Sequence, residues 1–298
     1  MTSQRGDDFA PIFALLVSAL AMACSPILQR LCDVGPFASA FWRLGLALPI
    51  LFAWAQYEDR TGAATPVVEI RHFPKATILA GLAFAGDLFF WHLSVSKTSV
   101  ANATFFATSA PVWVIIIGFI VWRKRVAGNV ISGLALCLLG GAALVWQSFQ
   151  FAPERLIGDF YGAMTAVFFG MYFLCVENGR KTGGGARITF EMSLIAAIIL
   201  LLWALYAEPH LFPHSFNGWL CLVGLAWLSH AGGQGLLSYA LGRLPATFSS
   251  LVIFLKAVAA AIMAWAFLGE RLSALQICGG VLILTGIYVA RPRAQAAI

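Results

Sequence analysis

A lysine lies near the middle of a long apolar segment, SSLVIFLKAVAAAIMAWAFLGER, which runs from Ser249 to Arg271. On insertion scales a lysine at the centre of a membrane-spanning helix costs about 2.5–3.5 kcal/mol, so such residues usually face protein or water and carry function. Its neighbours one and two helical turns away include Ser249 and Ala260, which leave room for a ligand. We therefore predict that Lys256 lines a cavity with Ser249 and binds a substrate carboxylate. The alternative is a structural charge paired with Asp87.

A second group of chemically useful residues lies in the segment AFAGDLFFWHLSVSK. Asp87 and His92 are five residues apart, which separates them by roughly 140° around a helix, so they cannot share one narrow face. We predict that Asp87 pairs with a positive charge. His92 is predicted to contact substrate or relay a proton, with a hydrogen-bonded contact between helices as the equal alternative. Trp91, beside His92, is predicted to form an aromatic wall of the substrate site.

Two other apolar segments carry polar and aromatic residues at steps of three or four. Inside a membrane helix such a stripe faces protein or a water-filled cavity rather than lipid. The first stripe is Asn102, Phe106, Ser109 and Trp113, and the second is His230, Gln234 and Ser238, with Tyr239 beside it. We predict substrate contacts for Phe106, Ser109, Trp113 and Tyr239. Hydrogen bonding between helices is the alternative reading of both stripes.

Enzyme and metal signatures are missing from the sequence. It contains no HExxH, GxSxG or GxxxxGK[ST] motif, and its six cysteines form no CxxC pair and no cluster with histidine. We therefore predict no catalytic residues, no metal site and no cofactor. Arg43 is expected close to a helix end, where it reaches the membrane surface or binds helix-end carbonyls, and is assigned a structural role.

The composition identifies the setting in which these residues act. Of 298 residues, 60% are hydrophobic and 11% charged, whereas soluble domains contain about 25% charged residues. The mean hydropathy is +0.85. The chain is therefore predicted to be an all-α integral membrane protein with the lipid bilayer as a partner. Its net charge of +6 reflects basic loops between spans, so no nucleic-acid partner is expected.

Ten spans of about 20 apolar residues can be drawn along the chain. They are 10–31, 37–56, 76–96, 100–122, 130–149, 158–176, 188–206, 219–241, 246–267 and 274–290. Thirteen Lys and Arg residues then fall on the side that holds both termini and four on the opposite side, which predicts cytoplasmic termini. A cleaved signal peptide ending near Cys24 is disfavoured, because removing the first span would destroy this asymmetry.

The second half of the chain repeats the first at an offset of about 145 residues. FFATSAPVWVIIIGFIVWRKR then lies over LVIFLKAVAAAIMAWAFLGER, and Gly133 and Gly140 lie over Gly279 and Gly286. Five helices per half require the halves to have inverted orientations. We predict two repeats, 1–150 and 151–298, with the substrate site between them near the midplane.

Four stretches carry a family resemblance: PFASAFWR (36–43), VANATFFATSAPVW (100–113), GDFYGAMTAVFFGMYF (158–173) and GERLSALQICGGVLILTGI (269–287). With them the chain resembles the drug/metabolite transporter superfamily, specifically its ten-helix EamA-type members, and most closely the YddG-type exporters of aromatic amino acids. The resemblance covers nearly the whole chain and implies a pore of two inverted halves around a central cavity. Lys256 departs from the family pattern, because a proline is common in this helix.

The function predicted from these features is export of a small metabolite by alternating access, most simply an aromatic or other neutral amino acid. The chain is expected in a bacterial inner membrane, as a monomer. Facilitated diffusion remains open, because Asp87 is the one carboxylate in a span interior. The alternatives are efflux of cationic drugs by proton antiport, an intramembrane enzyme acting on lipid substrates, and a scaffold without transport activity.

Overall fold

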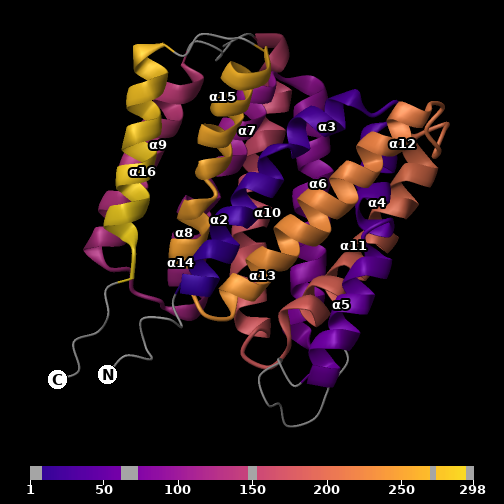
Figure 1. The fold of residues 1–298 in the computed structure, drawn as a ribbon, viewed down its shortest axis with the longest axis horizontal. Helices are drawn as coiled ribbons and strands as arrows, with labels where there is room; N and C mark the ends of the chain where they lie inside the picture. Colours follow the sequence, from indigo (N-terminus) through magenta and orange to yellow (C-terminus); the bar gives the residue numbers. More distant parts are fainter. Residues whose placement is uncertain (1–8, 62–72, 147–152, 269–272, 293–298) are drawn as a thin grey trace.

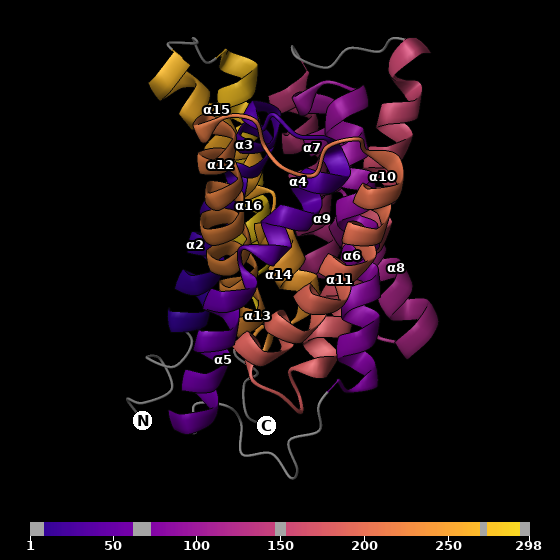
Figure 2. The same cartoon turned by 90° about the vertical axis from the view of Figure 1, so that its right-hand side faces the viewer.

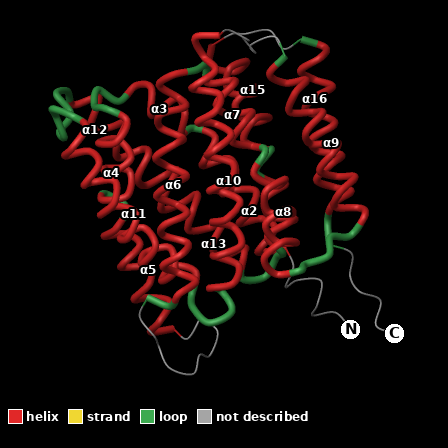
Figure 3. Tube along the Cα trace, turned by 180° about the vertical axis from the view of Figure 1, so that it is seen from behind, coloured by secondary structure: helices red, strands yellow, loops and turns green. Residues whose placement is uncertain are grey.

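The computed structural model describes residues 9–61, 73–146, 153–268 and 273–292. Every regular element within these residues is a helix, and the tube in Figure 3 shows only helices and the loops that join them. Figures 1 and 2 show that most of the helices run roughly alongside one another, as expected for a bundle that crosses a bilayer. The predicted all-α fold is confirmed.

Eight helical segments are long and apolar enough to cross a membrane. They are Ala10–Leu31, Pro36–Thr61, Lys75–Lys97, Ala101–Trp122, Gly128–Val145, Pro153–Gly179, Gly185–Ala207 and Phe216–Leu241. Two shorter apolar segments, Ala246–Ala259 and Ala274–Ala290, follow them in the described residues. These ten segments match the ten spans expected from the sequence. The first helix begins and the last helix ends at the same end of the molecule (Figure 1). The distribution of Lys and Arg predicts that this end faces the cytoplasm, and we call it the cytoplasmic end.

The individual helices subdivide several of these spans. The first half contains α2 (Phe9–Ala23), α3 (Ser25–Leu31), α4 (Pro36–Gly45), α5 (Leu48–Thr61), α6 (Lys75–Lys97), α7 (Val100–Thr108), α8 (Ala110–Trp122) and α9 (Gly128–Val145). The second half contains the short η1 (Pro153–Arg155), α10 (Leu156–Gly179), α11 (Gly185–Ala207), α12 (Phe216–Val223), η2 (Gly224–Gln234), α13 (Gly235–Leu241), α14 (Ala246–Val252), α15 (Leu255–Leu268) and α16 (Ala274–Ala290). The predicted repeat boundary at 150/151 lies outside the described residues.

Prolines explain three of the breaks inside spans. Pro26 and Pro111 lie in the first turns of α3 and α8, and Pro49 lies in the first turn of α5. A proline has no backbone N–H and its ring collides with the carbonyl one turn earlier, so the preceding helix must end. Non-helical backbone at membrane depth is tolerated where it is buried in protein or lines a cavity.

Two further interruptions arise without a proline. Between α14 and α15 the chain forms a tight 3₁₀-like turn, in which the amides of Ile253 and Phe254 donate to the carbonyls of Ser250 and Leu251, both at 3.1 Å. Lys256 follows directly, and its amide donates to Ile253 at 2.9 Å. The eighth span passes through η2, a π-helical segment between α12 and α13. Both deviations are typical of functional hinges.

A glycine contact between α9 and α16 demonstrates the inverted repeat. A Cβ atom added to Gly133 would lie 2.5 Å from the carbonyl oxygen of Gly286, and one added to Gly140 would lie 2.6 Å from that of Gly279. Gly133 and Gly140 align with Gly279 and Gly286 in sequence, so the pairing is crossed. Crossed pairing of equivalent residues is the property of a two-fold axis. The two helices form one edge of the bundle (Figure 1).

Two glutamates bind helix N-termini at opposite ends of one packed helix group, in which α4 and α5 lie against α11. The carboxylate of Glu58 in α5 accepts from the amides of Gly185 and Ala186, both at 2.9 Å. The carboxylate of Glu208, which follows α11, accepts from the amides of Phe37 and Ala38 at 2.6 and 2.9 Å. Each glutamate satisfies two orphan donors and complements the helix dipole. The pair is a second sign of the two-fold relationship.

Candidate functional site

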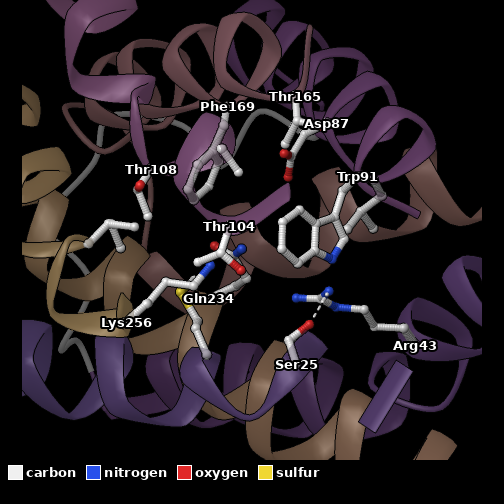
Figure 4. Close-up of a pocket in the computed structure, with 14 residues that line it drawn as sticks. Ser25, Arg43, Asp87, Trp91, Thr104, Thr108, Thr165, Phe169, Gln234 and Lys256 are labelled. Atoms are coloured by element: carbon white, nitrogen blue, oxygen red, sulfur yellow. Dashed lines mark hydrogen bonds between the residues drawn. The ribbon is translucent and has the colours of Figure 1, made fainter. Parts of the chain in front are cut away.

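A polar cavity lies in the middle of the bundle, between the two halves of the chain. Its lining residues come from seven helical spans: Met22, Ser25, Arg43, Asp87, Leu88, Trp91, Thr104, Ala107, Thr108, Thr165, Phe169, Gln234, Ile253 and Lys256. Figure 4 shows the side chains of Arg43, Asp87 and Lys256 extending toward the centre from three sides. The space left between the side chains is about 30 Å³, which accommodates water molecules and is too small for an amino acid.

Each broken span contributes a lining residue close to its break. Ser25 begins α3, Arg43 lies in the last turn of α4, and Thr108 ends α7. Gln234 ends the π-helical segment, and Lys256 directly follows the turn between α14 and α15. The helix interruptions therefore gather around one cavity, as they do in transporters whose discontinuous helices form the substrate site.

Arg43 lies close to a helix end, as expected, but this end of α4 is at the centre of the protein and not at the membrane surface. Its side chain is only 4% exposed. Nη1 donates to the hydroxyl of Ser25 at 3.0 Å and Nη2 to that of Ser229 at 3.4 Å. The second span ends its first helix at Gly45, in the interior of the bundle, so Arg43 is close to a helix end that is itself buried. The sequence reading of one continuous helix over 37–56 missed this break.

Asp87 and Lys256 complete a three-charge centre with Arg43. Asp87 is 6% exposed and interacts electrostatically with Arg43 and Lys256. No ion pair within contact distance joins Asp87 to either cation among the described residues. The Lys256 amine lies 5.6 Å from the ring centre of Trp91, within the range of a cation–π interaction. Two cations face one carboxylate, so the centre carries a net positive charge and has capacity for an anionic group.

The predicted residues of the fourth span lie outside this cavity. The Ser109 hydroxyl donates to the carbonyl of Phe106 at 2.6 Å. Phe106 and Trp113 contact α10, where Cβ atoms on Gly162 and Gly170 would approach them to 2.9 and 2.8 Å. The stripe on both sides of the break at Ser109 therefore faces α10 and serves contact between helices. Thr104 and Thr108 line the cavity instead.

His92, Tyr239 and Ser249 also lie outside the cavity. His92 is fully buried, and its main-chain carbonyl accepts from Nε2 of Gln29 at 3.5 Å. Tyr239 lies toward the cytoplasmic end, with the Arg243 guanidinium 4.6 Å from its ring centre. Ser249 is fully buried in α14, before the break. The structure thus brings Lys256, Trp91 and Asp87 together in the lining of one cavity, and the other predicted residues are not among those that line it.

The polar stripe of the eighth span, His230, Gln234 and Ser238, serves partly the cavity and partly hydrogen bonding between helices. Gln234 lines the cavity. His230 is fully buried and shares a hydrogen bond of 2.8 Å with the hydroxyl of Ser193 in α11. The Ser238 hydroxyl donates to the carbonyl of Gly185 at 3.1 Å. The latter two contacts join neighbouring helices.

Several lining residues were not singled out from the sequence. Ser25 directly precedes Pro26, and Thr108 lies three residues before Pro111. A proline inside an apolar span marks a break and would have pointed to both. Arg43 carried its own signal, since ionisable residues inside spans are functional by default. Threonines and phenylalanines such as Thr165 and Phe169 occur throughout the spans, so their types alone gave no signal.

Two inverted halves of five spans, with discontinuous helices around a polar central cavity, define a multi-pass membrane transporter. The sequence profile of the EamA-like transporter family matches residues 9–146 and 156–291. The chain therefore belongs to the EamA-like transporter family, within the drug/metabolite transporter superfamily, and is not an enzyme.

Comparison with individual proteins agrees with this assignment. The chain is 25% identical over 198 residues to an uncharacterized transporter of Archaeoglobus fulgidus, covering 66% of this chain and 69% of the relative. It is 24% identical over 221 residues to the uncharacterized transporter YxxF of Bacillus subtilis, covering 74% and 70%. The crystal structure of another protein superposes on this chain with a TM-score of 0.77 at 19% sequence identity, over 97% of this chain and 98% of that one. This last similarity shows the fold alone.

Proposed function

We propose that this transporter exports aromatic or other neutral amino acids by alternating access through the central cavity. The observation that carries the proposal is the charge pattern of the cavity. Its lining contains two cations, Arg43 and Lys256, and one anion, Asp87, together with the aromatic residues Trp91 and Phe169. A zwitterionic amino acid has one carboxylate, one ammonium group and one side chain, so each of its parts has a counterpart here.

The carboxylate of the substrate is assigned to Arg43 and Lys256. Arg43 is held in place by Ser25 and Ser229, which leaves its planar fork of donors oriented toward the cavity (Figure 4). Arginine matches a carboxylate with two parallel hydrogen bonds, and the lysine adds a compact charge on a flexible stem. In a dry interior both interactions are stronger than in water.

The ammonium group is assigned to Asp87 and the side chain to the apolar part of the lining. Asp87 lies one turn before Trp91 on α6, so the carboxylate and the indole project from one helix face. Leu88, Phe169 and Ile253 add apolar surface. A large neutral side chain suits this wall, because aromatic rings bury much area with few rotatable bonds.

The small volume of the cavity supports alternating access. About 30 Å³ is room for water only, so an amino acid must enter through a conformation in which the helices have moved apart. The breaks in the spans supply places at which such a movement can pivot. Asp87 is the one carboxylate among the described lining residues and is assigned to the substrate ammonium, so the proposal includes facilitated diffusion without a coupled proton.

Efflux of cationic drugs is the second candidate within transport. Asp87 and Trp91 together would suit a cation. Arg43 and Lys256 oppose it, because a substrate cation would be placed beside two buried positive charges. The amino-acid assignment is therefore favoured.

Counterflow in liposomes tests the proposal. Labelled phenylalanine, threonine and a cationic dye are offered to purified protein, with and without an imposed proton gradient, for wild type and Lys256→Ala. Lys97→Ala is the matched control, because Lys97 is exposed at the end of α6. Exchange of amino acids without a gradient, lost in Lys256→Ala and retained in Lys97→Ala, supports facilitative amino-acid export. Normal amino-acid exchange by Lys256→Ala, or movement of the dye alone, overturns it.

A further inference from the structure

A second concave site lies at the cytoplasmic end of the molecule, away from the central cavity. It is a pocket of about 280 Å³ between the end of α10, the loop from α13 to α14 and the residues that follow α8. Its polar lining consists of Lys124, Glu177, Arg180, Lys181, Gly242 and Arg243. Four of these six residues are cations and one is an anion.

The carboxylates near the pocket are already engaged by other donors. Glu177 accepts from the amide of Ala246 at 3.0 Å and forms an ion pair with Lys124. Glu58, whose charge acts on Arg180, accepts hydrogen bonds from the two amides at the start of α11. In the described part of the chain neither Arg180 nor Arg243 forms an ion pair.

Arg180 distinguishes this pocket from an ordinary basic loop. The positive charge of cytoplasmic loops is explained by topology when the residues are solvated. Arg180 is only 8% exposed, its guanidinium lies against Gly242, and its Nε has no hydrogen-bond partner among the described residues. Burial lowers the pKa of Arg180, the charge of Glu58 opposes this, and Arg243 lowers the pKa further.

A buried arginine keeps its charge under all physiological conditions, so its desolvation must be offset by something. One of its donors is used by the carbonyl of Gly183. The neighbouring Arg243 stacks on Tyr239 and adds repulsion rather than compensation. An anion in the pocket would bring a negative charge beside the two guanidinium groups, which would offset the desolvation of Arg180 and relieve the repulsion between the two cations.

We propose that this cytoplasmic pocket binds an oxyanion, a phosphate or a carboxylate group, through Arg180, Lys181 and Arg243. The pocket is large enough for one phosphate group and its immediate substituents and too small for a drug-sized ligand. Basic pockets between membrane helices on the cytoplasmic side suit anionic lipid headgroups. A free anion from the cytoplasm offers the same chemistry. The site is independent of the amino-acid assignment made for the central cavity.

The test measures binding rather than transport, so its outcome does not depend on the transported substrate. Thermal unfolding of the purified protein in neutral detergent is followed with increasing short-chain phosphatidylglycerol, short-chain phosphatidylcholine or inorganic phosphate, at constant ionic strength. The variants are Arg180→Gln and Arg243→Gln. Lys75→Gln is the control, because it removes one positive charge at the cytoplasmic start of α6, outside the pocket. Arg243 is exposed, so its variant remains informative if Arg180→Gln fails to fold.

Phosphatidylglycerol, phosphate or both should stabilise wild type and Lys75→Gln at the same concentrations, while Arg243→Gln should need about tenfold more. Stabilisation by phosphatidylglycerol alone identifies a lipid headgroup as the source of the oxyanion, and stabilisation by phosphate alone identifies a soluble anion. Equal stabilisation by phosphatidylcholine, or an identical response of Arg243→Gln and Lys75→Gln, overturns the proposal.

Discussion

At the two ends of the helix group formed by α4, α5 and α11, a glutamate from one span caps the first turn of the other. Glu58 does so at the cytoplasmic end and Glu208 at the outer end. The glycine before each capped turn is also repeated, since a Cβ on Gly35 or Gly184 would collide with the respective carboxylate at 2.2 or 2.3 Å. The helix ends of the two halves are thus built alike.

The middle of the same helix group is different. Arg43 lies eight residues after the N-cap of α4, and Glu191 lies seven residues after the N-cap of α11. Arg43 extends into the central cavity, whereas Glu191 forms an ion pair with Arg187 and accepts from the amide of Phe73. At a similar depth along the two helices, the halves therefore carry opposite charges with unrelated partners.

The fourth and ninth spans show the same contrast. Both are interrupted, at Ser109 and at Ile253. A proline, Pro111, follows the first break, and Lys256 follows the second. The repeated architecture supplies two hinges, and only one of them carries a charge into the cavity. This asymmetry gives a substrate one preferred orientation, which a symmetric lining would not do.

The largest expected effect comes from the charged centre. Arg43→Gln removes both the hydrogen bonds to Ser25 and Ser229 and the proposed carboxylate contact. Hydrogen bonds to charged groups are worth about 1.5–3 kcal/mol, and about 1.4 kcal/mol corresponds to a factor of ten. We therefore expect amino-acid counterflow to fall by about 100-fold. Initial rates are compared at equal amounts of reconstituted protein.

The repeat supplies the control for that experiment. Glu191→Gln changes a charge at a similar depth along α11 without touching the cavity, and its counterflow should stay near wild type. Arg43→Lys keeps the charge but loses the fork of donors, so its rate should lie between wild type and Arg43→Gln. Equal rates for Arg43→Gln and Glu191→Gln would show that the cavity charges are structural.

An intermediate effect, on the stability of the fold, is expected for substitutions at the glycine contact between α9 and α16. Gly140→Val and Gly286→Val each place a side chain against the facing backbone, where an added Cβ would lie 2.6 Å from a carbonyl oxygen. Overpacking of this kind costs about 1–3 kcal/mol. Because the two glycines are equivalent under the two-fold axis, the two variants should lower the midpoint of thermal unfolding by similar amounts.

Gly128→Val is the matched control for this pair, since a Cβ at Gly128 meets no other atom within 4 Å. It should leave the unfolding midpoint unchanged apart from a small gain in helix propensity. If Gly140→Val destabilises the protein strongly and Gly286→Val does not, the two equivalent glycines contribute unequally to stability. The two-fold relationship would then hold for the geometry of the α9–α16 contact and not for its energy.

The sequence was sufficient to predict the two-fold repeated architecture of the helices. Span length, the distribution of Lys and Arg, and the aligned glycines predicted ten inverted helices, because these features are imposed by the bilayer and by close helix contact. The cavity was only partly predictable. Lys256, Asp87 and Trp91 were placed in the site because each is conspicuous inside an apolar span.

The remaining cavity residues could not be identified by periodicity. Phe106 and Trp113 lie on the face of the fourth span that contacts α10, whereas Thr104 and Thr108, one turn apart in α7, line the cavity. Periodicity groups residues on one face of a helix but does not say which neighbour that face meets. Arg43 was misplaced because a buried helix end cannot be distinguished from a surface end by sequence distance alone.

The smallest expected effect is the loss of stability when either of the two glutamate caps is removed. Glu58→Gln and Glu208→Gln each replace a carboxylate that accepts from two amides by a group with one acceptor oxygen, and loss of a cap costs about 0.5–2 kcal/mol. The caps lie at opposite ends of α11, roughly 30 Å apart at 1.5 Å per residue. Each variant should therefore lower the unfolding midpoint by a similar amount, and the double variant should show the sum. A midpoint for the double variant that equals that of one single variant would mean that the two ends of the helix group are coupled, and that opening one membrane face already releases the other.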